Sequence, residues 1–284
     1  MSVNTEIRAA RSAVVRPFSL FYITATAVRS LTPNMVRVTF GGPDLAGFTS
    51  GGLDQRVKLF FPLPGQDVPA LPPPDDWYQA YQDMSDEVRP IMRTFTIRTH
   101  RPDVQEIDID FAVHGDVGPA SRWAIRARPG DVLGLLGPDV RHPAGSGVEY
   151  HPSPSEWQLI VGDDTALPAI GAIIETLQAG TRVRAFVEVA SDADVQEFDT
   201  GGDVEITWLA RTGSQTTPVS RLVEAVRNAD LPSGTAYAWT AGESGMIREL
   251  RRHLLTELGW DRGQGYFGGY WRADSTPEPT DSDD

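Results

Sequence analysis

The hydrophobic pattern of this chain changes near its middle, and that change constrains the possible folds more than any other feature. Before residue 142, short apolar runs are separated by Gly and Pro, whereas after residue 155 such runs alternate with stretches of helical periodicity. The segment between them contains Pro143, Gly145, Gly147, Pro152 and Pro154. Because 284 residues exceed the roughly 100 to 200 residues of one domain, we predict two domains, 1–145 and 153–273.

The first domain is expected to be an antiparallel β-barrel. Six runs are rich in β-forming residues, at 18–28, 35–40, 56–61, 92–98, 106–113 and 131–136. A helix is predicted over 119–127, and the proline-rich stretch 62–84 is expected to be an irregular surface excursion. Several short strands at this spacing are typical of a barrel rather than of a helical bundle.

The second domain is expected to be a Rossmann-like, parallel α/β domain. Strands are predicted at 157–162, 182–189, 204–209 and 235–241. Between them, apolar residues recur on one helical face, as Ile170, Ile173 and Leu177 do. Such alternation implies a parallel sheet. The segment 274–284 is acidic and carries two prolines, so we predict a disordered acidic tail.

Composition excludes several classes of function. The net charge of −14 disfavours nucleic acids and anionic membranes as partners, because polyanions are repelled. The chain has no cysteine, which excludes thiolate nucleophiles and cysteine-ligated clusters, so a redox role would require an organic cofactor. No run approaches about 18 apolar residues, so no membrane insertion is expected and the predicted location is the cytoplasm. Nothing in the sequence indicates the oligomeric state.

The first motif that could carry chemistry ends a predicted strand. Arg93 offers a guanidinium fork that can grip a diphosphate, and Phe95 offers a ring that can lie against a flavin, with Thr96 beside it. Taken alone, the pattern also fits a barrel-core Phe95 and a solvated Arg93. The motif is therefore weak without its context.

A second motif runs from a strand through glycines into a helix start, at His114, Gly118, Ala120 and Ser121. Backbone N–H groups at a helix N-terminus attract phosphate, and glycines permit its close approach. An ordinary capped turn is an equally good interpretation of the bare pattern, and His114 alone could be a structural residue.

A third set of residues follows strands of the predicted parallel sheet. Gly162, Asp164, Thr165 and Ala166 come directly after the first strand, and Gly242 with Glu243 follows the strand at 235–241. Both sets fall at the carboxyl edge, where such sheets bind ligands. The first is not a G-x-G-x-x-G fingerprint, and Thr165 could simply cap a helix. Paired acids there disfavour tight phosphate contact.

Taken together and in order, these motifs resemble the siderophore-interacting proteins, flavin-dependent ferric-siderophore reductases of the ferredoxin-reductase-like superfamily. The resemblance spans nearly the whole chain and rests on the segments 93–98, 114–124, 162–169 and 269–272. The family often has tyrosine where Phe95 stands and glutamate where Asp164 stands.

The resemblance implies an FAD cofactor and a nicotinamide donor, NADH or NADPH. It assigns FAD to Arg93, Phe95, Thr96, His114, Gly118, Ala120 and Ser121, with Asp164, Thr165 and Ala166 near the adenine or the nicotinamide. It places the nicotinamide donor at Gly162, Gly242 and Glu243. Some members of the family receive electrons from ferredoxin, so the donor stays open. Ser191 and Asp192 argue weakly against a 2′-phosphate, whereas Arg211 could accept one.

The substrate implied by the resemblance is a ferric siderophore. Many ferric siderophores are anionic, so basic side chains should surround the exposed flavin edge. Lys58 is the only lysine of the chain and matches a substrate-facing lysine of the family. Arg141 and Arg248 could complete a basic rim, although each could equally be a solvated charge or part of a surface ion pair.

Two other functions remain open from the sequence. One is a general NAD(P)H-flavin or quinone reductase on the same scaffold, without preference for siderophores. The other is a siderophore-binding, iron-handling protein without turnover. Bleaching of a bound flavin by reduced nicotinamide would argue against the second.

Overall fold

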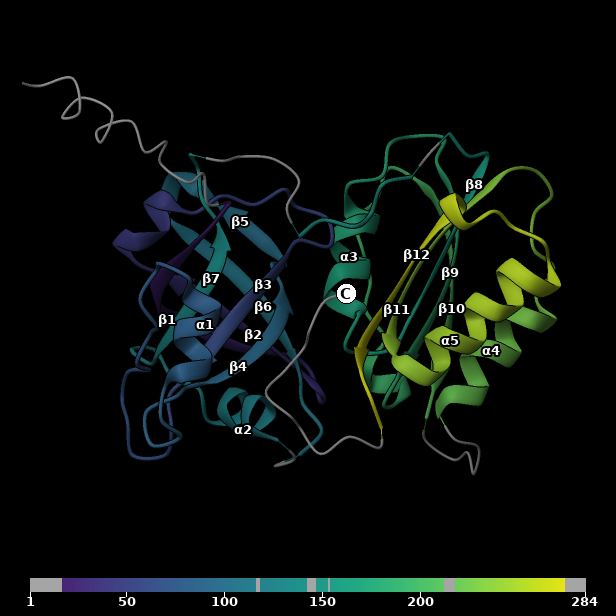
Figure 1. Ribbon diagram of the computed structural model, residues 1–284. Coiled ribbons are helices and arrows are strands. Elements are labelled where there is room, and N and C mark those ends of the chain that lie inside the picture. The colour runs from purple at the N-terminus through teal and green to yellow at the C-terminus, as the bar shows by residue number, and fades with distance from the viewer. Residues whose placement is uncertain (1–16, 116–117, 142–146, 153, 212–217, 274–284) are drawn as a thin grey trace, which may run out of the picture.

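The computed structural model describes residues 17–115, 118–141, 147–152, 154–211 and 218–273 (Figure 1). It contains a seven-stranded antiparallel sheet followed by a five-stranded parallel sheet, which confirms the predicted fold class. The predicted tail at 274–284 lies outside the described residues. Among the residues described, no helix is both long enough and apolar enough to cross a bilayer.

The first sheet curls into an open barrel with the strand order β4-β3-β7-β1-β2-β6-β5. Its strands are β1 (Phe18–Thr32), β2 (Met35–Gly41), β3 (Arg56–Phe61), β4 (Ile91–Thr96), β5 (Thr99–Arg101), β6 (Glu106–Ala112) and β7 (Val132–Pro138). Alternate residues point into the barrel, so that Val38, Phe40, Leu59 and Ile107 are fully buried together. Only the short strand β5 was not predicted.

Helix α2 (Pro119–Arg126) closes one end of the barrel with a single large side chain. The Trp123 ring stacks on Phe40 with a centroid distance of 6.0 Å and meets Phe61 at 5.7 Å and Phe111 at 5.6 Å. This contact fixes the start of α2 relative to the strands.

The stretch 62–84 is not wholly irregular, which corrects the sequence prediction. It contains helix α1 (Trp77–Asp83). The Tyr81 ring packs on the Phe60 ring with a centroid distance of 5.9 Å, and the Tyr81 hydroxyl donates a hydrogen bond to the carbonyl of Pro90. The apolar residues of α1 cover the outer face of the barrel. The prolines just before the helix concealed it in the sequence.

The second sheet is entirely parallel, in the order β10-β9-β8-β11-β12. Its strands are β8 (Trp157–Gly162), β9 (Arg182–Val189), β10 (Asp203–Ala210), β11 (Ala236–Glu243) and β12 (Gly265–Trp271). Strand β12 was not predicted, because three glycines interrupt its pattern.

Helices cover both faces of this sheet (Figure 1). Helix α3 (Leu167–Glu175) lies on the face toward the barrel, while α4 (Pro218–Asn228) and α5 (Ser244–Arg252) lie on the opposite face. Successive residues of β8 therefore enter different cores: Ile160 packs with the α3 side, and Leu159 and Val161 pack with the α4 and α5 side.

Buried polar contacts join the two sheets. The Asp54 carboxylate, fully buried before β3, accepts a hydrogen bond of 2.8 Å from Nε1 of Trp239 in β11. The Asp194 carboxylate, after β9, accepts from the Thr32 hydroxyl and the Asn34 backbone at the β1–β2 turn. Because each sheet lies inside one predicted range, we retain 1–145 and 153–273 as proposed domains.

Candidate functional site

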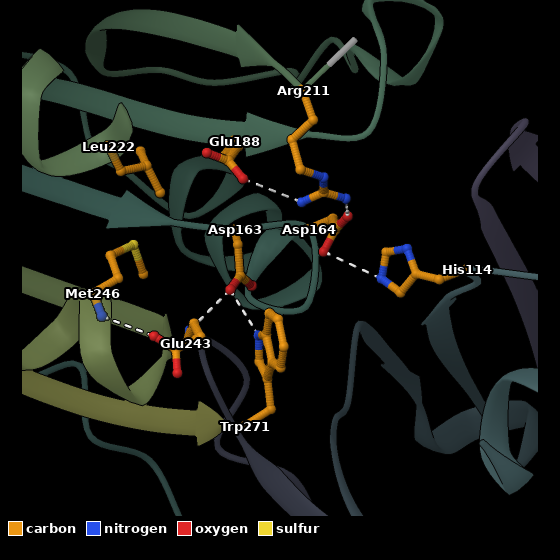
Figure 2. Close-up of a pocket in the computed structure, with 9 residues that line it drawn as sticks. All are labelled: His114, Asp163, Asp164, Glu188, Arg211, Leu222, Glu243, Met246 and Trp271. Carbon is orange, nitrogen blue, oxygen red and sulfur yellow. Dashed lines mark hydrogen bonds and ion pairs between the residues drawn. The ribbon is translucent and has the colours of Figure 1, made fainter. Parts of the chain in front are cut away.

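A cavity of about 190 Å³ opens at the carboxyl edge of the parallel sheet (Figure 2). The strand ends bring its lining residues together, with one residue from the first domain: His114, Asp163, Asp164, Glu188, Arg211, Leu222, Glu243, Met246 and Trp271. Open α/β sheets bind ligands at this edge. The cavity is therefore the candidate site for a nucleotide donor.

Asp163 is a structural acid that ties three strand ends together. One carboxylate oxygen accepts from the backbone and hydroxyl of Thr165. The other accepts from the backbone N–H of Glu243 at 2.9 Å and from Nε1 of Trp271 at 2.8 Å. Burial raises the pKa of Asp163, but its oxygens are already satisfied by these donors. Thr165 is predicted to lie near the adenine or the nicotinamide, and in this structure its hydroxyl donates a hydrogen bond to the Asp163 carboxylate.

Asp164 connects the two domains. Its carboxylate lies 3.5 Å from Nε2 of His114 and forms an ion pair with Arg211 (Figure 2). Burial alone would raise the pKa of Asp164, yet the hydrogen bond and charge of His114 and the charge of Arg211 hold that pKa below its usual value. The same hydrogen bond raises the pKa of His114 against the opposing effect of burial.

Glu188 carries the one incompletely bonded carboxylate oxygen of the cavity. Its side chain is 1% exposed, and Oε1 lies 3.3 Å from Nη1 of Arg211. Its Oε2 is buried and finds no hydrogen-bond partner among the described residues. Burial raises the pKa of Glu188 to about 6, although Arg211 opposes the shift. Such an oxygen is a ready acceptor for a hydroxyl or amide of a ligand.

The predicted glycines at the edge serve close packing. A Cβ atom on Gly162 would lie 2.7 Å from Cβ of Ala166, and one on Gly242 would lie 2.6 Å from a carboxylate oxygen of Asp163. Glu243 accepts the Met246 N–H at 2.9 Å and so caps α5. Of these predicted donor-binding residues, Glu243 lines the cavity, and the glycines permit the strand ends to approach.

Gly118, directly before α2, has a backbone conformation that favours glycine. Gly118 has a φ of +85°, and a Cβ there would meet nothing within 4 Å. Gly118 is also the N-cap of α2 and supplies no side-chain cap, while Ala120 is half-buried against the barrel core. A helix start with open space around it fits a diphosphate.

Ser121, which the sequence predicts to be a donor to phosphate, makes two hydrogen bonds with the segment before α2. Its hydroxyl donates to the Gly115 carbonyl at 2.8 Å and accepts from the His114 N–H at 3.2 Å. Ser121 thus holds the loop that presents His114 to the second domain.

The predicted flavin motif on β4 meets the α2 turn around one aromatic ring. Phe95 is half-buried, and its ring centroid lies 4.7 Å from that of Phe111. The Phe111 ring also contacts Trp123 of α2. Arg93 is half-buried on the same strand face, because the two residues are separated by one position. Thr96 points to the opposite face and is 6% exposed. The residues available at β4 and α2, an aromatic ring, a guanidinium and an open helix start, fit a flavin dinucleotide.

The three predicted substrate residues lie apart. Lys58 is half-buried on β3 opposite Thr94, on the face away from Phe95, and its ammonium group forms no hydrogen bond or ion pair with the described residues. Arg141 is held by Asp139, with Nε 2.8 Å from Oδ1. Arg248 lies in a second cavity, on α5. The structure therefore does not assemble these three residues into one rim.

Sequence reasoning missed several residues of the cavity. Of these residues, Glu188 could most easily have been predicted. It is the one acid in the otherwise apolar end of β9, and a lone acid at such a position is a recognisable signal of a functional site. Leu222 and Met246 gave no comparable signal, because only the folded chain brings α4 and α5 to this edge; Trp271 lies in the motif segment 269–272 but was not assigned to the site.

Comparison with protein families gives two adjoining matches. Residues 24–142 match the model of the siderophore-interacting FAD-binding domain. Residues 155–274 match the model of the siderophore-interacting protein. The two matches meet at the same glycine- and proline-rich segment where the hydrophobic pattern changes.

Full-length relatives agree with these matches. Ferric vibriobactin reductase ViuB of Vibrio cholerae is 32% identical over 87% of this chain and 88% of its own. An NADPH-dependent ferric-chelate reductase of Escherichia coli is 30% identical over 88% of this chain and 92% of its own. A siderophore utilization protein from T. fusca is 35% identical, with a TM-score of 0.77 over 92% of this chain and 95% of its own.

Proposed function

This chain belongs to the siderophore-interacting protein family, and we propose that it is an FAD-dependent ferric-siderophore reductase that uses NADH or NADPH. One observation carries the proposal beyond family membership. His114, at the turn expected to hold FAD, reaches Asp164 in the cavity expected to hold the donor. This contact supports a proposed FAD site and a proposed donor site that adjoin each other, as hydride transfer requires.

The FAD site is proposed at the β4 strand and the α2 turn. Arg93 and the open start of α2 at Gly118 and Ala120 would hold the diphosphate, and Phe95 would lie against the flavin. An FAD held by these residues would supply the redox chemistry, which is acceptance of a hydride from the nicotinamide and single-electron transfer to Fe(III) of the substrate. Thr96, His114 and Ser121 would shape the surrounding loop, as their burial and hydrogen bonds support.

The donor site is proposed at the carboxyl-edge cavity, around Asp164, Ala166 and Glu243. The unpaired oxygen of Glu188 would accept a hydrogen bond from a donor hydroxyl or amide. Arg211 is the one arginine lining this cavity, and two carboxylates hold it. A 2′-phosphate would have to compete with both, so the choice between NADH and NADPH depends on that exchange. A ferredoxin remains an alternative donor.

The substrate is proposed to be an anionic ferric siderophore that Lys58 attracts. Lys58 carries an ammonium without a partner among the described residues, so its charge is available to a ligand, unlike that of Arg141. The Fe(II) formed by reduction would leave because siderophores hold it weakly. We also propose that the protein acts in the cytoplasm, where reduced nicotinamides are produced.

An anaerobic experiment tests the proposal. The purified chain is loaded with FAD, its flavin absorbance is recorded, and NADH or NADPH is added, followed by a ferric siderophore and a ferrous-iron trap. Bleaching of the flavin, then its recovery with formation of the ferrous complex, is the expected result. Bleaching with transfer only to quinones would indicate a general flavin reductase, and failure to bind FAD would reject the assignment.

A further inference from the structure

Four arginines line one concave surface of this acidic protein. The surface borders a cavity of about 520 Å³ whose lining consists of Arg248, Arg251, Arg252, Leu255, Thr256, Trp260, Asp261 and Arg262. The whole chain has 39 acidic side chains and 25 Lys and Arg. A random surface of such a chain would be acidic, so this concentration of positive charge is a local departure from its average.

These arginines are poorly neutralised. The guanidinium groups of Arg248 and Arg262 form no hydrogen bond or ion pair with any residue that the structure describes. Arg251 lies over the ring of Phe267 at 5.9 Å, an interaction that leaves its charge in place. Arg252 is 3.7 Å from Glu257, which Arg227 also pairs at 3.1 Å.

The one acid in the lining forms no ion pair with these arginines. Asp261 precedes the short helix η5 (Arg262–Gln264), where its backbone N–H donates to Oε1 of Gln264 at 2.7 Å, and its carboxylate pairs with none of the four arginines among the described residues. Three guanidinium groups of the cavity therefore have no carboxylate partner among the described residues.

The backbone is arranged to gather these side chains on one side. Arg248, Arg251 and Arg252 are spaced i, i+3 and i+4 along α5, which puts them on one helical face. Like charges at this spacing destabilise a helix. The π-helical segment η4 (His253–Glu257) then widens the turn and brings Leu255 and Thr256 into the lining, and such segments are frequent at functional sites.

The arginine cavity and the donor cavity flank α5 but share no lining residue: buried Met246 lines the donor cavity, and exposed Arg248, two residues on, lines this one. Arg262 is three residues before β12, which begins at Gly265 opposite Ala238, near the start of β11. Trp271, at the other end of β12, lines the donor cavity. Seven residues of strand span roughly 20 Å. A ligand bound in the arginine cavity does not occupy the donor site. It is therefore a ligand other than the nicotinamide donor.

The geometry points to a binding site for a small, multiply charged oxyanion, a polycarboxylate or a phosphate ester. Arginine forks match carboxylate and phosphate oxygens in bidentate geometry, and three or four of them converge here. The cavity volume lies within the range of small-molecule sites, roughly 300 to 1,000 Å³. The exposed position of the arginines keeps the site accessible from solvent.

Isothermal titration calorimetry on the full chain, without nicotinamide or siderophore, tests this site independently of the proposed reductase activity. Pyrophosphate and citrate are titrated at 25 mM and 150 mM KCl. Saturable binding of at least one is expected, weaker at the higher salt, with at least a tenfold loss of affinity in Arg248→Gln/Arg262→Gln. The matched control, Arg29→Gln/Arg128→Gln, removes two positive charges from exposed positions of the first domain and should bind as the wild type does.

Three results would overturn the site. The first is the absence of saturable binding at 25 mM KCl, and the second is an equal loss of affinity in the control, which would reflect net charge alone. The third is sedimentation with phosphatidylglycerol vesicles without binding of either small anion, which would make the arginines a membrane contact. Single variants Arg248→Gln and Arg262→Gln, with thermal unfolding curves recorded without anion, keep the comparison valid if the double variant folds poorly.

Discussion

His114 of the first domain and Asp164 of the second lie 3.5 Å apart, ring nitrogen to carboxylate oxygen, across the boundary between the two sheets. Ser121 fixes the His114 loop through two hydrogen bonds, and Arg211 holds the opposite side of Asp164. The relative position of the α2 turn and the donor cavity therefore depends on a short chain of charged groups. Its titration should be measurable.

We expect the pKa of His114 to lie above 6.5 and to fall when Asp164 is replaced by Asn. The hydrogen bond to Asp164 favours the imidazolium, so the raised pKa stabilises the folded state below pH 6.5. That stabilisation is lost as pH rises through the folded pKa. Nuclear magnetic resonance titration of the His114 ring protons checks this. An unchanged His114 pKa in Asp164→Asn would contradict it.

Glu188 should make the protein less stable as pH rises from about 4.5 to 6. The folded state raises the pKa of this buried carboxyl to about 6, so over that range the unfolded chain ionises while the folded chain keeps the proton. Above pH 6, this difference in ionisation lowers the free energy of unfolding by on the order of 1 to 2 kcal/mol. Glu188→Gln should remove this slope in urea unfolding measured from pH 4 to 7.

The control for this slope is Glu205→Gln on β10. Glu205 is exposed and pairs with Arg184 at the surface, so its removal should leave the slope in place. If Glu188→Gln and the wild type gave parallel curves, the elevated pKa would be wrong.

Much of the fold was readable from the sequence, and the exceptions have physical causes. The alternating and helical patterns predicted the strands of both sheets to within a few residues, because burial of one face imposes those periods. β12 was missed since its glycines carry no pattern, and it forms because β11 offers an unpaired parallel edge. α1 was missed because its stability comes from Tyr81 packing on the barrel.

The site was readable only as separate pieces. Motif positions predicted which residues end strands or begin helices, and His114, Asp164 and Glu243 from these motifs line the cavity. Their pairing was not predicted, because ion pairs such as Asp164 with Arg211 join residues 47 positions apart. The separation of Lys58 from Phe95 follows from strand register, which the sequence alone did not fix.

Gly118→Ala should weaken FAD binding at least tenfold. The added methyl group would occupy the open space beside the α2 start, where the diphosphate is proposed to lie, and a positive φ disfavours alanine. Gly180→Ala is the matched control, since Gly180 has a φ of +88° and equally open surroundings in a remote turn. Flavin fluorescence titration of both variants separates loss of the site from general strain; an equal loss in both would count against the assignment.

The hydrogen bond from Trp239 to Asp54 should stabilise the association of the two sheets by roughly 1 to 3 kcal/mol, the cost of leaving a buried acceptor without its donor. Trp239→Phe removes the donor. Trp157→Phe on the adjacent strand β8 is its control, because the buried Nε1 of Trp157 has no partner among the described residues. Urea unfolding should show a greater loss of stability for Trp239→Phe, and equal losses would indicate that only ring volume matters.

Lys58→Gln should raise the KM for anionic ferric siderophores several-fold and leave the KM for neutral ones nearly unchanged. The Lys58 ammonium has no partner among the described residues, so its removal exposes no unpaired acid and should cost little stability. Arg128→Gln, which removes one exposed positive charge elsewhere in the first domain, controls for net charge. The rate of flavin reduction by nicotinamide should not change, because Lys58 lies on the strand face opposite Phe95. Equal effects on anionic and neutral substrates would show that Lys58 shapes the surface without attracting charge.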